Sequence, residues 1–183
     1  ARYPRGRVYA VDSLSATGGI GLLAELAAKN RVQGMSVEEN ASNIETMKHR
    51  VCHLFLVEDL MYLKRGGRIP AASAVVGTAL SVKPILVIDE LGMLRVMSKR
   101  RGRRHAAEYL LDQYQSSRDP SEHRISIIHA DAPDIASLLA DGVKQIDRRA
   151  DITIGMLSPI IGAHTGPGMA AVIYFGDRAE IAH

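Results

Sequence analysis

Residues 162–168 read GAHTGPG, so three glycines and a proline enclose a histidine and a hydroxyl. Glycine permits positive φ and close backbone approach, while Pro167 fixes its own φ and biases the residue before it toward extended geometry. The apolar runs 152–161 and 169–175 on either side predict a loop that joins two strands. Such a loop can present backbone NH groups and an imidazole to one small acidic group. The alternative is a tight turn that happens to contain a histidine.

A second glycine motif stands at residues 60–69, which read LMYLKRGGRI. The apolar run predicts a short helix that ends at Gly66, and Lys64 and Arg65 suit its negative C-terminal pole. Arg68 lies beyond this helix end, so a capping role does not explain it. Its planar guanidinium suits a carboxylate or a phosphate.

The N-terminal part of the chain alternates strand-like and helical patterns. We expect a strand at Val8–Val11, a helix with an apolar face from Ile20 to Ala27, a helix from the Ser36/Glu39 capping box to about Arg50, and a strand at Cys52–Val57. Two strands and two helices make an incomplete α/β unit, which normally packs into a larger parallel sheet.

The rest of the chain has enough elements to close a core of its own. We expect helices at Pro70–Leu80, Arg103–Tyr114 and Pro133–Ile146, a hairpin at Ile85–Met97 turning at Asp89–Gly92, a loop at Ser116–Glu122, and strands at Arg124–His129, Asp151–Met156 and Met169–Phe175. The sequence therefore predicts an α/β fold with a partial N-terminal parallel-sheet α/β domain over residues 1–68. A C-terminal α+β domain follows over residues 69–183.

Composition narrows the class of protein. The 183 residues are 46% hydrophobic, enough for a buried core, and no stretch is long and apolar enough for a membrane span or a secretory signal. We therefore expect a cytoplasmic protein. The single Cys52 excludes an internal disulfide and is expected to be a small buried side chain.

The net charge of +3 is concentrated in one basic segment, Lys99–Arg104. The chain has no Trp and only two Phe, so base stacking is poorly supported and nucleic acid is an unlikely partner. The segment is either a solvated loop or a docking patch for an acidic partner. In the second case the docking residues are Arg100, Arg101, Arg103 and Arg104.

Catalytic and metal motifs find little support. His49 and His53 have helical metal-ligand spacing, but the predicted helix ends between them and no further ligand completes a set. Asp12, Ser13 and His164 all fall in turns, yet nothing resembles a strained nucleophile elbow. We therefore expect no catalytic residues and no metal.

The ordered set of motifs resembles the DegV family of bacterial fatty-acid-binding proteins. It comprises Val11-Asp12-Ser13, the "YLKRGGRI" segment, "KPIL" at residues 83–86, the basic helix start and the terminal "GAHTGPGM". The resemblance implies a two-domain protein that encloses one long-chain fatty acid and, as the binding subunit of bacterial fatty acid kinase, presents the carboxylate to a separate kinase subunit. No cofactor is implied.

The resemblance also implies where the acid binds. The family-matched candidates for holding the carboxylate are His164, Thr165 and Arg68, and the ligand site further includes Gly166, Gly168 and Ser13. The small residues of the predicted helix 70–80 would leave room for an acyl chain. Two alternatives remain open: an enzyme acting on a small phosphorylated or carboxylated metabolite, and a nucleic-acid-binding regulator that uses residues 99–104.

One departure from the family pattern concerns the N-terminus. Family members carry most of an N-terminal domain, with a serine- and threonine-rich motif, before the region matched here. We therefore expect the strands and apolar faces of residues 8–57 to lack partners, and self-association through this incomplete sheet is one way to cover them.

Overall fold

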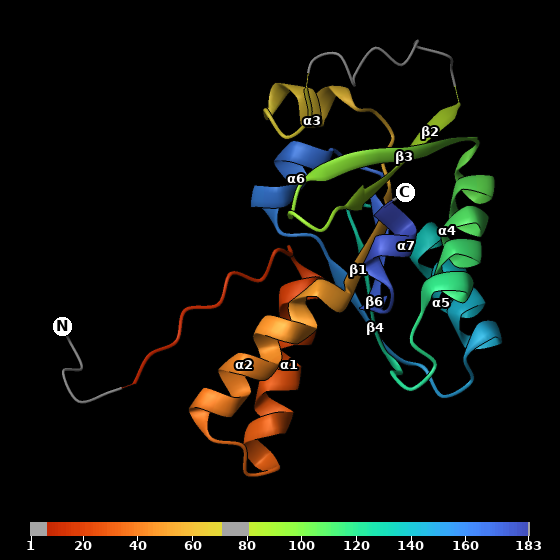
Figure 1. Cartoon of the computed structure of the whole chain (residues 1–183). Coiled ribbons are helices and arrows are strands. Elements are labelled where there is room, and N and C mark those ends of the chain that lie inside the picture. Colours follow the sequence, from red (N-terminus) through yellow and green to blue (C-terminus); the bar gives the residue numbers. More distant parts are fainter. Residues whose placement is uncertain (1–6, 71–80, 183) are drawn as a thin grey trace.

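A computed structural model describes residues 7–70 and 81–182, which form a six-stranded sheet with helices on both faces (Figure 1). The predicted α/β class is confirmed. The strands are β1 (Val51–Leu56), β2 (Val82–Ile88), β3 (Leu94–Arg101), β4 (Arg124–His129), β5 (Asp151–Met156) and β6 (Ala170–Phe175). The helices are α1 (Gly18–Val32), α2 (Val37–Met47), the 3-10 turn η1 (Lys48–Arg50), α3 (Met61–Arg65), α4 (Arg103–Ser117), α5 (Pro133–Ile146), α6 (Pro159–Thr165) and α7 (Arg178–Ala182).

The strand order is β3-β2-β1-β6-β4-β5. Among the strands of the described ranges, only β4 and β5 run parallel, and the other neighbouring pairs are antiparallel. The two central strands, β1 and β6, are buried along their whole length and consist almost entirely of apolar residues, as strands covered on both faces do.

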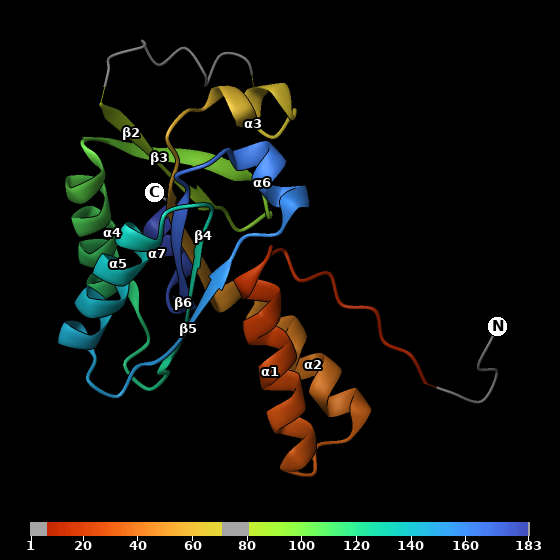
Figure 2. The same ribbon diagram turned by 180° about the vertical axis from the view of Figure 1, so that it is seen from behind.

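Helices cover the two faces of the sheet (Figures 1 and 2). On one face, α4 and α5 pack on side chains such as Leu54 of β1 and Val172 of β6. On the other, α1, α3 and the start of α6 pack near Phe55 and Ile173. Because successive side chains of a strand point to opposite faces, the same two strands supply both cores.

Local signals explain several element boundaries. Ser36 accepts from the backbone NH of Glu39 at 3.2 Å and Glu39 reaches back to the NH of Ser36 at 2.9 Å, which confirms the predicted capping box. The β2–β3 hairpin turns where the carboxylate of Asp89 accepts from the backbone NH groups of Leu91 and Met93. Gly92 supplies the positive φ, 79°, that this turn requires.

The structure corrects four local predictions. Val8–Val11 is not a strand but part of an extended segment that leads away from the sheet (Figure 2). The 162–168 segment does not simply join two strands, because α6 occupies Pro159–Thr165. Pro159 at its first position and Gly166 at its end, with φ 76°, are ordinary helix boundary signals that the apolar run obscured. The short helix α7 was not predicted, and Ser116 and Ser117 belong to α4 rather than to a loop.

The expectation that residues 8–57 lack sheet partners is wrong for β1. This strand pairs antiparallel with β2 on one side and with β6 on the other, in registers such as Leu54 with Val87 and His53 with Ile173. It is the third strand of a sheet whose other members all follow it in the chain. The domain boundary at residue 68 stays a prediction, and the helix expected at 70–80 falls almost wholly outside the described residues.

Candidate functional site

A cavity of about 280 Å³ lies on the face of the sheet that carries α1, α3 and α6. Its floor comes from alternate residues of the two central strands, and its walls come from the segment before α1, from α3, from the β2–β3 hairpin and from α6. The lining is mainly apolar and includes Phe55, Leu63, Ile88, Leu94, Ile161, Met169, Ala171 and Ile173.

Three of the predicted ligand-binding residues line this cavity: Arg68, His164 and Thr165. They come from segments almost a hundred positions apart in the chain, namely the turn after α3 and the last turn of α6. The structure therefore places a guanidinium, an imidazole and a hydroxyl in the lining of one mainly apolar cavity. Each can donate a hydrogen bond to an anionic oxygen.

The two glycine motifs meet because glycine lets their backbones approach closely. A Cβ on Gly66 would stand 2.1 Å from Nδ1 of His164, and a Cβ on Gly166 would stand 2.5 Å from the ring of Tyr62. Both distances are far below van der Waals contact, so a side chain at Gly66 would displace the imidazole of His164, and one at Gly166 would displace the ring of Tyr62. The two glycines therefore leave room for these rings between α3 and α6.

The three donors are held to different degrees. Arg68 is exposed and donates from Nη1 to the carbonyl of Gly66 at 2.7 Å, which folds its guanidinium back over the turn. Thr165 is buried, and its hydroxyl lies 3.4 Å from the carbonyl oxygens of both Ile161 and Gly166. Since one hydroxyl has one proton and both distances are long, this hydroxyl can turn to a stronger acceptor.

The other predicted ligand residues lie outside the cavity lining. Gly166 and Gly168 shape the backbone, with φ values of 76° and 81°, and a Cβ on Gly168 would stand 2.3 Å from Cγ of Glu58. Ser13 lines a different hollow, between the N-terminal segment and the helices α1 and α2. Its hydroxyl oxygen accepts a hydrogen bond from the backbone NH of Ser15 at 3.3 Å.

Three polar residues of the cavity lining were not predicted as ligand-site residues: Ser15, Thr17 and His53. Ser15 has a buried hydroxyl without a hydrogen-bond partner among the described residues. His53 is only 3% exposed, and burial lowers its pKa to about 4, so the ring is neutral at physiological pH. The sequence placed Ser15 in the same turn as Ser13, but only the folded loop shows which serine faces the cavity.

Metal binding finds no support in the part of the chain that the structure describes. No group of three or more His, Cys, Asp or Glu side chains is arranged to hold a metal ion there. His49 lies in η1 and His53 in β1, which removes the helical spacing that the pair would need. Cys52 is buried, and burial raises the pKa of its thiol to about 12.

The basic segment does not present four equivalent cations. Arg100 stacks on the ring of Tyr109 at 3.6 Å, and Arg104 pairs with Glu108 at 3.1 Å. Arg103 pairs with both Glu58 and Asp134 and is half-buried. Arg101 is exposed, and no ion pair of its side chain is found within the described residues.

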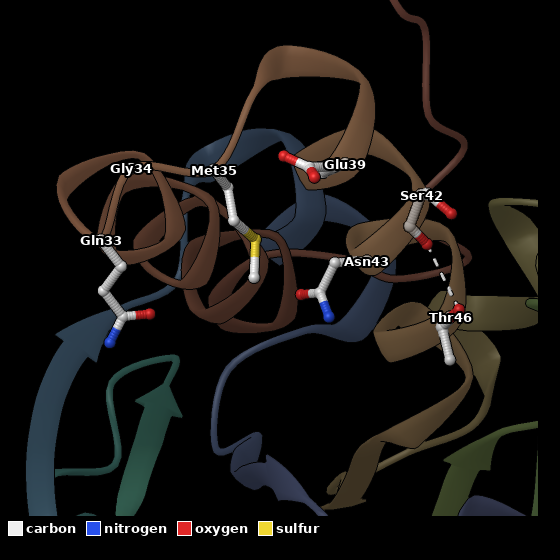
Figure 3. A pocket seen from close by; sticks show the side chains of 7 residues that line it. All are labelled: Gln33, Gly34, Met35, Glu39, Ser42, Asn43 and Thr46. Atoms are coloured by element: carbon white, nitrogen blue, oxygen red, sulfur yellow. Dashed lines mark hydrogen bonds between the residues drawn. The ribbon is translucent and has the colours of Figure 1, made fainter.

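A third hollow, at the end of the α1–α2 pair where the two helices are joined, is open to solvent. Figure 3 shows its lining, Gln33, Gly34, Met35, Glu39, Ser42, Asn43 and Thr46. The hydroxyl of Thr46 donates to the carbonyl of Ser42, and Glu39 is the capping residue of α2. Glu39 and Thr46 are thus engaged locally, and the predicted ligand residues all lie elsewhere.

The sequence profile of the DegV family matches residues 1–177. The chain belongs to the DegV family. A DegV domain-containing protein of Clostridium perfringens is 36% identical over 180 residues, which are 98% of this chain and 62% of that relative. The chain spans 62% of the length of this relative and of DegV domain-containing proteins of Lactococcus lactis and Streptococcus pyogenes.

Solved structures of DegV proteins share the fold. A Thermus thermophilus DegV protein described for fatty acid binding is 28% identical with a TM-score of 0.83, over 96% of this chain and 62% of that protein. The Streptococcus pneumoniae fatty acid kinase B3 protein, loaded with linoleic acid, matches over the same shares with a TM-score of 0.87 at 23% identity. In the described ranges, no helix combines the length and the apolar character needed to cross a membrane.

Proposed function

We propose that this DegV protein holds a long-chain fatty acid, with the carboxylate anchored near His164 and Arg68. One observation carries the proposal: Arg68, which lies far from His164 and Thr165 in the sequence, lines the same mainly apolar cavity as they do. An amphipathic acid needs both parts of such a site, apolar walls for the chain and donors for the head group.

The energetics favour a long acyl chain over a small soluble acid. Each methylene that leaves water contributes about 0.8 kcal/mol, so the chain supplies most of the affinity. A carboxylate buried without partners would oppose binding by several kcal/mol, and the three donors remove that penalty. The Thermus relative, described for fatty acid binding, supports this ligand class.

In this proposal the protein is a carrier and not a catalyst. The polar groups at the cavity are donors to an anion, and the reacting partner is a separate fatty acid kinase subunit that phosphorylates the presented carboxylate. The family resemblance supports this role, and the exposed Arg101 offers such a partner a point of contact.

Mass spectrometry of lipid extracted from freshly purified protein tests the proposal. We expect one fatty acid per protein after expression in bacteria, and uptake of added oleic acid by protein stripped of lipid. Lipid-free protein that also fails to take up oleic acid would contradict the proposed ligand.

A further inference from the structure

The segment just before α1 forms one wall of the cavity and has an unusual backbone. Ser15, Ala16 and Thr17 line the cavity, and Leu14 and Thr17, neither of them glycine, have φ values of 47° and 43°. Such conformations are unfavourable for residues with a side chain and persist only when surrounding contacts enforce them. The contacts that enforce this wall therefore decide the shape of the site.

Two buried side chains from distant parts of the chain hold the wall by its carbonyl groups. Nη2 of Arg178, from α7, donates to the carbonyl of Leu14 at 2.8 Å. Nε2 of His53, from β1, lies 3.3 Å from the carbonyl of Ala16. A carbonyl oxygen only accepts, so Nε2 carries the proton of the neutral ring.

His53 is a polar residue where packing alone does not require one. Its Nδ1 is buried and has no hydrogen-bond partner in the described part of the chain. A leucine would fill much of the same space between the sheet and α1 without an unsatisfied nitrogen. The bond to Ala16 is what the imidazole provides and an apolar side chain does not.

The ring also fits only because of one glycine. A Cβ on Gly19 would stand 2.4 Å from Nε2 of His53 and 2.6 Å from its Cε1. Gly21, two residues later in α1, has nothing within 4 Å of such a Cβ. The same helix therefore offers a substitution that displaces the imidazole and a matched one that does not.

We propose that His53 is a positioning residue that holds the Ser15–Thr17 wall in the shape that receives the ligand. This inference rests on the proposed fatty acid site and adds to it a residue that acts through the backbone of Ala16. His53 donates one hydrogen bond to the carbonyl of Ala16 in this wall, and Arg178 donates another to the carbonyl of Leu14, just before it.

The test compares four variants of the protein: His53→Leu, His53→Gln, Gly19→Ala and Gly21→Ala. The ligand probe is cis-parinaric acid, whose fluorescence reports its release when unlabelled oleic acid is added in excess. Hydrogen–deuterium exchange of the amides of residues 14–17 is measured in parallel on lipid-free protein, and thermal unfolding is recorded for each variant.

We expect His53→Leu and Gly19→Ala to release the probe about five- to tenfold faster than the wild type, the effect of losing one neutral hydrogen bond. Exchange at residues 14–17 should rise in the same two variants. His53→Gln keeps an NH donor at a similar reach and should restore slow release, and Gly21→Ala should match the wild type. A purely structural role would lower the unfolding temperature without this rescue.

The outcomes separate the two claims. If wild-type exchange at residues 14–17 and wild-type release persist in His53→Leu and Gly19→Ala, the positioning role is overturned. If His53→Leu does not fold, the comparison of Gly19→Ala with Gly21→Ala decides. Failure of the wild type to bind cis-parinaric acid would overturn the fatty acid site itself, while the exchange measurement would still show whether His53 holds the wall.

Discussion

The two faces of the sheet are packed differently at its central strands, although β1 and β6 contribute side chains to both faces. On the α4–α5 face, Leu54 and Val172 meet a solid layer in which Ala106 and Leu110 of α4 are fully buried. On the opposite face, Phe55 and Ile173 form the floor of a cavity. One side of each strand therefore serves stability and the other side leaves room for a ligand.

The difference arises from what the helices place over the strands. Small residues such as Ala106 and Ala107 let α4 lie close against the sheet, and Tyr114 and Tyr174 pack edge to face at 4.9 Å. On the other face the segment before α1 and one side of the short helix α6 line the cavity, and small Ala171 adds no bulk to its floor. The comparison teaches that closely packed helix sides fill one face of the sheet, whereas a loop and a short helix leave room on the other.

The largest expected effect tests the solid face. Leu110→Ala removes a fully buried side chain from the layer between α4 and the sheet. We expect the free energy of unfolding to fall by about 2–5 kcal/mol, because a cavity remains in a rigid environment. Urea denaturation measures this loss. The folded fraction should retain fatty acid as the wild type does, and a parallel loss of ligand affinity would show that the faces are not independent.

The second prediction uses pH to examine the hollow face. The pKa of His53 is lowered to about 4 by burial, whereas a histidine in the unfolded chain titrates near 6.5. The unfolded chain therefore binds more protons between these values, and the folded state loses up to about 3 kcal/mol as pH falls from 6.5 to 4.

Urea denaturation at several pH values checks this loss. His53→Gln lacks the titrating group, so its stability should fall less over the same range. Hydrogen bonds, chiefly from Ser121, lower the pKa of Asp119, and the hydrogen bond from His123 lowers the pKa of Asp147 although burial acts in the opposite direction. Both carboxylates therefore reduce the free energy of unfolding in acid, and they do so equally in the wild type and in His53→Gln. Identical pH profiles would contradict the assignment to His53.

The third prediction concerns the head group. His164→Ala and Arg68→Ala should each weaken binding of oleic acid by about 1–3 kcal/mol, because each removes a donor to the carboxylate. Arg65→Ala is the matched control, since Arg65 is also exposed but ends α3 and lies outside the cavity lining. Competition with a fluorescent acid measures the affinities, and equal losses at Arg65 and Arg68 would remove the distinction between them.

The smallest effect is expected on the basic segment. Arg101→Ser should leave fatty acid binding unchanged and slow phosphorylation of the bound acid by a kinase partner a few-fold at low salt, because exposed charges act mainly on encounter. Arg103→Ser should instead reduce stability by at most about 1 kcal/mol, since its half-exposed ion pairs lie within the protein. Equal phosphorylation rates for Arg101→Ser and the wild type would contradict a docking role of residues 99–104 and indicate a solvated loop.

Local chemistry in the sequence predicted most of the secondary structure and part of the site. The capping box of Ser36 and the hairpin turn at Asp89 rest on contacts within a few residues, and the strands β1 and β6 are recognisable as apolar runs of consecutive residues; the structure confirms all of them. Arg68 lies just past the end of its helix, where a capping role does not explain it, and in the folded chain it lines the cavity.

Tertiary structure alone decided which segments meet. An apolar run such as Cys52–Val57 is equally typical of a buried strand in a parallel sheet and of the centre of an antiparallel one, so its pairing with β2 and β6 could not be predicted. The same holds for Ser15 and His53, whose importance depends on a backbone bent by contacts with β1 and α7. Caps and periodicity are properties of neighbouring residues and can be recognised in a sequence. A cavity is a property of segments brought together by folding, because its walls are joined by hydrogen bonds and close contacts between residues far apart in the chain.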